Sequence, residues 1–218
     1  MARIFVAISL LPVIMIVATL WLGWRVGDYA QQAVDLRQLD RKIAETEPGA
    51  DLASHPEFAP RLAEISRARD RFRTHFFFGV GTALIAIFIN CISVTYLIGT
   101  SRWVKEVTEA YGLDRNLTIK STQLKRQTFP WSLAGIVSVL TIVALGAASD
   151  PATGRAATAE WAGPHGAAAV IGGGVIVWSF LVQGLNLQRN AEIIAEVTEA
   201  VRQERERRGL QVDPAPAA

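Results

Sequence analysis

Residues 76–98 read FFFGVGTALIAIFINCISVTYLI, and no charged side chain interrupts them. A helix needs about 20 apolar residues to cross the hydrocarbon core of a bilayer. Three more charge-free stretches meet or approach that length: Ile4–Trp24, Trp131–Ala148 and Gly166–Leu187. Backbone polar groups inside lipid must bond within their own segment, which favours helices. The sequence therefore predicts an all-α membrane protein that crosses the bilayer four times as a helical bundle.

The overall composition excludes some classes of function but does not decide the fold. Half of the 218 residues are apolar, which is also usual for a soluble domain. The net charge of +2 gives no basic field that would attract nucleic acid. The single cysteine, Cys91, excludes an intramolecular disulfide framework and a cysteine-based zinc or iron–sulfur site. The expected partner is the lipid bilayer, because charge is excluded from four long stretches.

The distribution of basic residues bears on orientation. Four crossings put both termini on one side, together with the 102–129 connection and its six basic residues. The positive-inside rule makes that side cytoplasmic. The cluster Arg67, Arg69, Arg71 and Arg73 before the second span argues for the opposite orientation. We expect a multi-pass protein of a bacterial-type inner or plasma membrane, with N- and C-termini in the cytoplasm.

The long segment between the first two spans has a helical pattern. Leu36, Leu39 and Ile43 recur at a spacing of three and four residues, which predicts a narrow apolar seam on a charged helix. Turn-forming residues follow this helix, as in Glu47-Pro48-Gly49. We expect an extramembrane helical hairpin over about 27–74. Its charges are either a solvated face or a contact surface for a protein partner or a second copy of the chain.

These patterns divide the chain into four parts. Residues 1–112 form a first two-helix unit that includes the hairpin, and a basic connection follows. The second two-helix unit ends in an amphipathic helix, and the tail after it is expected to be disordered. These last three parts cover residues 113–129, 130–209 and 210–218.

A short repeated motif relates the two units. The pentapeptide EVTEA occurs at Glu106–Ala110 and again at Glu196–Ala200, 90 residues later. The same offset relates His75 to His165. A weaker echo relates the ends of the first and third spans, Leu22-Gly23 and Leu145-Gly146. The pattern predicts a tandem two-helix repeat, and the alternative is chance similarity between membrane-flanking helices rich in Glu, Ala and Val.

The histidine pair is the one candidate site for chemistry. Two neutral imidazoles on facing helices can provide the axial ligands of a b-type haem. Arg71 and Arg73 are candidate partners for the haem propionates. Small residues that would let a flat ring approach lie nearby: Gly79, Gly81 and Gly166–Ala169. The alternative is that His75 and His165 are ordinary interfacial residues with no ligand, so haem b is the alternative cofactor and no other is expected.

Several other functions are disfavoured by what the spans lack. No acidic or basic residue lies inside them, which argues against a pump or an ion-coupled transporter. Asn90 and Gln183 are costly to expose to lipid and are expected to face other helices. The sequence contains no nucleophile–base–acid constellation, phosphate-binding loop or metal-ligand motif, so no catalytic residue and no metal site are expected.

Three functions remain open at this point. The first is a non-catalytic scaffold or accessory subunit of a membrane assembly. The second is a haem-carrying electron-transfer anchor that uses His75 and His165. The third is a membrane enzyme or carrier for a small apolar substrate.

Overall fold

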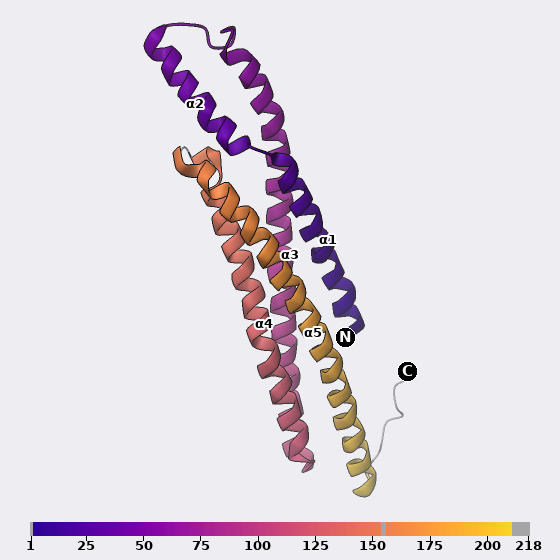
Figure 1. Ribbon diagram of the computed structural model, residues 1–218. Helices are drawn as coiled ribbons and strands as arrows, with labels where there is room; N and C mark the ends of the chain where they lie inside the picture. The colour runs from indigo at the N-terminus through magenta and orange to yellow at the C-terminus, as the bar shows by residue number, and fades with distance from the viewer. Residues whose placement is uncertain (1, 154–155, 211–218) are drawn as a thin grey trace. The chain divides into compact units, whose positions relative to one another are not determined.

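The computed structural model describes residues 2–153 and 156–210, and all regular elements among them are helices (Figure 1). Four helices are long and apolar enough to cross a membrane: α1 (Ala2–Val26), α3 (Phe58–Tyr111), α4 (Arg115–Ala148) and α5 (Ala162–Arg207). The remaining elements are α2 (Tyr29–Thr46) and two 3-10 helices, η1 (Pro151–Thr153) and η2 (Ala156–Trp161). The predicted all-α class with four candidate membrane helices is confirmed. The tail expected over 210–218 lies outside the described residues beyond Leu210.

Three of the long helices extend well beyond their apolar stretches. The end of α3 is the clearest case, because Gly112 has a φ of +66° and so ends the helix in the left-handed conformation. The N–H of Leu113 donates to the carbonyl of Thr108 at 3.0 Å and closes the capping turn. Helix α3 therefore continues beyond its apolar stretch and ends at a glycine cap.

The segment treated as a connection in the sequence, 113–129, is mostly helical. The Asp114 carboxylate accepts a hydrogen bond at 2.9 Å from the N–H two residues later, and α4 begins at Arg115. Leu117 and Leu124 are buried, so this part of α4 has its own apolar face. The linker between α3 and α4 is therefore only a short turn, and the basic residues lie on a helix.

The described chain packs as two compact units, each assembled from distant pieces of sequence. We call Met1–Ser9, Phe88–Gly135 and Trp178–Ala218 the polar-core unit. We call Leu10–Ile87 and Ile136–Val177 the histidine unit. Because α3, α4 and α5 each contribute to both, neither unit is a continuous segment of the chain.

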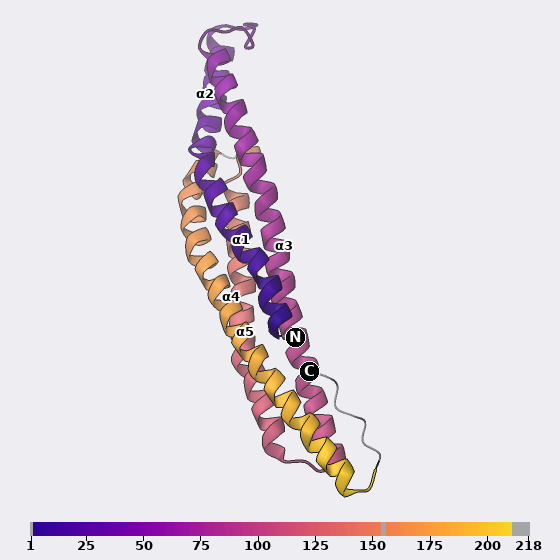
Figure 2. The same ribbon diagram turned by 90° about the vertical axis from the view of Figure 1, so that its right-hand side faces the viewer.

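In the polar-core unit, α3, α4 and α5 lie side by side (Figures 1 and 2). An apolar cluster at the charged end of these helices holds them together: Val104, Leu117, Leu124, Ile193 and Val197. The buried positions of α5 follow the alternating three- and four-residue spacing of a coiled coil. This packing explains why the helices continue beyond their apolar stretches.

Closer to the apolar stretches, the contacts between α3, α4 and α5 become polar. The Gln183 amide Nε2 donates to Asn90 Oδ1 at 2.8 Å and to Ser179 Oγ at 2.6 Å. Ser179 Oγ in turn donates to the backbone carbonyl of Trp131 at 2.8 Å. Two more bonds follow along α5, from Asn186 to Thr128 and from Asn190 to Thr100. Asn90 and Gln183 are fully buried, which confirms that they face other helices.

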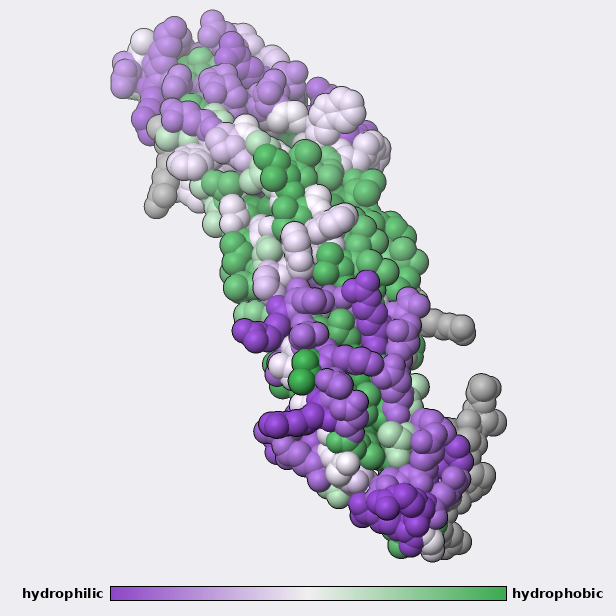
Figure 3. Space-filling model, turned by 60° about the horizontal axis from the view of Figure 1, so that its bottom comes forward, coloured by the Kyte–Doolittle hydropathy of each residue, from purple (hydrophilic) through white to green (hydrophobic). Residues whose placement is uncertain are grey.

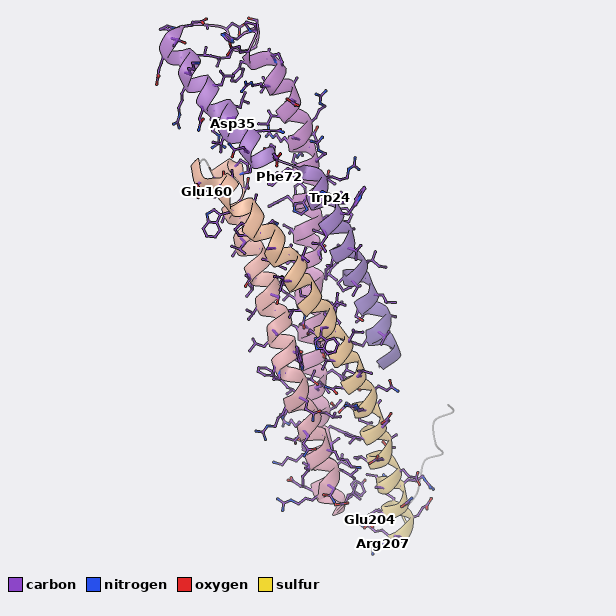
Figure 4. All side chains as sticks on the ribbon, in the orientation of Figure 1. Trp24, Asp35, Phe72, Glu160, Glu204 and Arg207 are labelled. Carbon is purple, nitrogen blue, oxygen red and sulfur yellow. The ribbon has the colours of Figure 1, made fainter. Side chains whose placement is uncertain are left out.

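In the histidine unit, the two loops between the long helices pack against each other. Helix α2 contacts η1 and η2, and the Arg37 guanidinium donates to the carbonyl of Pro151. Ile43 of the predicted seam is buried. Phe72 of α3, labelled in Figure 4, packs its ring 5.0 Å from that of Tyr29 at the start of α2. The long first loop is therefore an ordered helical structure.

Large apolar side chains cover much of the exposed surface of the long helices. On the face shown in Figure 3 they gather together and are not scattered among polar ones. Phe77 and Leu84 are each 65% exposed, and Ile171 is 69% exposed. By contrast, the end of α5 is a cluster of charges, where hydrogen bonds from Arg207 and then Arg208 lower the pKa of Glu204 to about 2 (Figure 4).

Candidate functional site

His75 and His165 lie next to each other in the histidine unit. His75 is well inside α3, whereas His165 is in the first turn of α5. Their ring centres are 6.1 Å apart and the ring planes make an angle of 69°. Both side chains are half-buried. The two residues that the sequence relates by a 90-residue offset therefore form one pair in space.

Each histidine is held by a backbone carbonyl of a neighbouring helix. His75 Nδ1 lies 3.1 Å from the carbonyl oxygen of Thr19, and His165 Nδ1 lies 3.2 Å from that of Ile142. A carbonyl oxygen can only accept, so Nδ1 carries the proton in both rings. In the neutral imidazole, Nε2 then keeps a free lone pair. Both rings are thus in the tautomer that can ligate a metal through Nε2.

A glycine faces each imidazole. A Cβ atom at Gly23 would lie 2.9 Å from His75 Cε1, and one at Gly146 would lie 3.1 Å from His165 Cε1. Each ring therefore packs directly on the backbone of the helix that accepts its hydrogen bond. Sequence reasoning did not assign these glycines to the site, although the repeated Leu-Gly pair was the signal that marked them.

The contacts around the two histidines match position by position. Gly23 and Gly146 are 123 residues apart, and so are Thr19 and Ile142. Thr19 bonds Thr82 at 2.9 Å between hydroxyl oxygens. The corresponding contact joins Ile142 to Gly172, 90 residues after Thr82: the Ile142 side chain lies 2.9 Å from where a Cβ on that glycine would stand. At these positions, contacts between α1 and α3 therefore correspond to contacts between α4 and α5.

The two candidate arginines differ in their relation to the pair. Arg71 precedes His75 by one helical turn and lies on the same face of α3. Arg73 precedes His75 by two residues, which puts it on the opposite face. Both arginines are exposed. Of the two, Arg71 is therefore the better candidate to pair with a group held at the His75 ring.

The small residues near the pair serve two purposes. Gly79 and Gly81 are covered by side chains of α1, with Thr19 Cγ2 and Met15 Cε at 3.8 and 3.5 Å from the position of a Cβ. They therefore permit close helix packing. Gly166, directly after His165, has nothing within 4 Å of the position of its Cβ, so the backbone there is open.

The described residues contain no group of three or more His, Cys, Asp or Glu side chains that could hold a metal ion. The donor set of the pair is therefore two imidazoles. A set of two protein donors is smaller than that of structural or catalytic zinc sites, and it equals the axial set of a haem. Comparison with protein-family models, with characterised proteins and with solved structures finds no match to this chain.

Proposed function

We propose that the chain is a multi-pass membrane protein in which α1, α3, α4 and α5 cross the bilayer. The exposed apolar side chains of these helices support insertion, because a soluble protein rarely exposes contiguous apolar patches of this kind. Helices also satisfy their own backbone hydrogen bonds, as lipid requires. The membrane then covers the exposed apolar surface.

We expect both termini to face the cytoplasm, because the basic residues of α4 that precede its apolar stretch lie on the same side. A protease added to intact cells should leave a C-terminal epitope tag uncut. The same protease should cut the tag after the cells are opened. Cleavage of the tag in intact cells would reverse the orientation.

We propose further that this membrane protein carries a b-type haem between His75 and His165 and serves in electron transfer. The matched pair of imidazoles, each with Nδ1 bonded to a carbonyl, is the observation that supports this function. His75 and His165 would hold the haem iron, each through the Nε2 that its hydrogen bond leaves free. The two rings are close enough to hold one group together, with ring centres 6.1 Å apart.

The chain would contribute binding and orientation to such a site. Nε2 of His75 and of His165 would bind the haem iron, and the carbonyls of Thr19 and Ile142 would fix the ring orientation. Arg71 would pair with a propionate. A bound haem supplies a one-electron redox couple, whose potential the axial ligands and surrounding residues adjust.

The test is the absorbance spectrum of the full chain, purified in mild detergent from haem-replete cells. A reduced-minus-oxidised difference spectrum with a Soret band and an α-band is the expected result. Haem quantified by pyridine extraction should approach one per chain. A flat difference spectrum from such cells would remove the haem function.

The matched contacts also support a tandem two-helix repeat, in which α1 with α3 corresponds to α4 with α5 in the histidine unit. Two parallel repeats are related by an axis along the membrane normal, so their histidines meet at one depth. One haem shared between equivalent residues is what such an arrangement favours. The first repeat differs by its long loop, which inserts α2 and extends α3 outward.

A non-catalytic scaffold or accessory subunit remains the second candidate function. The charged ends of α3, α4 and α5 support it, because they form an ordered structure with its own apolar cluster. An ion pair of 3.1 Å between Lys120 and Glu196 joins α4 to α5 at this end. If the spectrum is flat, these helices are the surface to test for a partner or a second copy.

A further inference from the structure

We propose that a depression between α3 and α4 in the polar-core unit binds one anionic phospholipid. The inference rests on the proposed insertion in a membrane and is independent of the haem. The depression has a volume of about 560 Å³. That volume lies within the usual range of ligand sites.

The lining combines apolar and cationic side chains. Val94, Leu97 and Ile98 come from the last turns of the apolar stretch of α3, and Phe129 comes from α4. The cationic groups Lys125 and Arg126 lie one turn before Phe129. An acyl chain against the apolar side chains would therefore place its phosphate beside two cations.

A second depression adjoins the first on α4 and shares a cationic residue with it. It has a volume of about 300 Å³, shares Arg126 with the first, and is lined mainly by polar residues of α4: Arg115, Thr118, Thr122 and Gln123. Arg126 thus lines both depressions. A phospholipid at the membrane surface has an acyl chain to place against the apolar side chains and a phosphate to place beside Lys125 and Arg126.

The charges at the site call for an anion. Among the described residues, Lys120 is paired with Glu196 and Arg102 with Glu106, whereas Arg115 of the second depression forms no ion pair. No carboxylate within 4 Å is found for Lys125 or Arg126 over the described ranges. Basic pockets between membrane helices on the cytoplasmic side are where anionic headgroups bind.

The test is native mass spectrometry of the full chain in detergent, titrated with dioleoyl phosphatidylglycerol or with dioleoyl phosphatidylcholine. We expect one equivalent of the anionic lipid to be retained in preference to the zwitterionic one. The double variant K125Q/R126Q should retain it at least about tenfold less. The matched control R102Q/K105Q makes the same change in net charge on exposed α3 residues and should retain the lipid normally.

The proposal would be overturned by equal retention of the two lipids, by an equal loss in the control variant, or by normal retention in K125Q/R126Q. Glycerol 3-phosphate, which has the phosphate without acyl chains, should not compete, and competition would mean a site for a free phosphate group. Failure of the membrane proposal would be seen earlier, as protein in the soluble fraction. Failure of the haem proposal would leave lipid retention unchanged, because His75 and His165 do not line the depression.

Discussion

Replacing His75 or His165 with alanine should abolish the haem α-band, because either change removes one of two axial donors. The matched control is His55→Ala, which removes a histidine from the loop after α2 and should leave the spectrum intact. Each variant is first checked for a monodisperse elution profile in detergent. A full α-band in either His75→Ala or His165→Ala would contradict the assignment of that ligand.

The glycines give a subtler form of the same test, in which both histidines are retained. Gly23→Ala places a methyl group 2.9 Å from His75 Cε1, and Gly146→Ala places one 3.1 Å from His165 Cε1. The ring must shift in both cases, and changes in the groups that orient a ligand typically weaken binding by about 10- to 100-fold. We expect haem occupancy to fall in both variants. The two losses should be similar if α1 with α3 and α4 with α5 are a true repeat.

The control for these substitutions is Gly79→Ala, also at a helix contact. Its Cβ would lie 3.8 Å from Thr19 Cγ2, which is an ordinary van der Waals distance. Its haem occupancy should therefore equal that of the original chain. An equal loss in all three glycine variants would mean that general helix packing, and not the histidine orientation, is being disturbed.

The sequence was sufficient to predict the helices because each apolar stretch is a signal that can be read separately from the others. A charge-free run of about 20 residues predicts a helix without any knowledge of its neighbours. The end of α3 at Gly112 was equally predictable, because a glycine after the last apolar position is a local signal for a helix end. The helical form of 113–129 was harder to predict, since its apolar positions, such as Leu117 and Leu124, are few and separated by polar residues.

The candidate site was predictable only in part. The spacing of His75 and His165 suggested a pair, but their hydrogen bonds depend on how α1 packs on α3 and α4 on α5. No spacing in the sequence reveals that Thr19 and Ile142 accept those bonds. The position of Arg73 could have been predicted, because a separation of two residues on a helix places it on the opposite face from His75.

Substitutions among the buried polar residues between α3, α4 and α5 should have a second large effect, on stability. Asn90→Ala should lower the free energy of unfolding by about 1–3 kcal/mol, because Gln183 loses its acceptor while it stays buried. The measurement is reversible unfolding in mixed detergent micelles. Asn116→Ala, an equivalent change at an exposed position of α4, should cost less than about 0.5 kcal/mol.

A substitution of Gln183, the hydrogen-bond partner of Asn90, separates the energy of the hydrogen bond from the effect of lost packing. Gln183 Oε1 has no hydrogen-bond partner among the described residues, so Gln183→Met removes a buried group that is only partly satisfied. We therefore expect Gln183→Met to cost less than Asn90→Ala. Once methionine stands at 183, Asn90→Ala no longer strands an amide, and the double variant should cost less than the sum of the two single changes. Strict additivity would mean that the bond at 2.8 Å between these side chains contributes nothing measurable, and that the polar residues are tolerated for another reason.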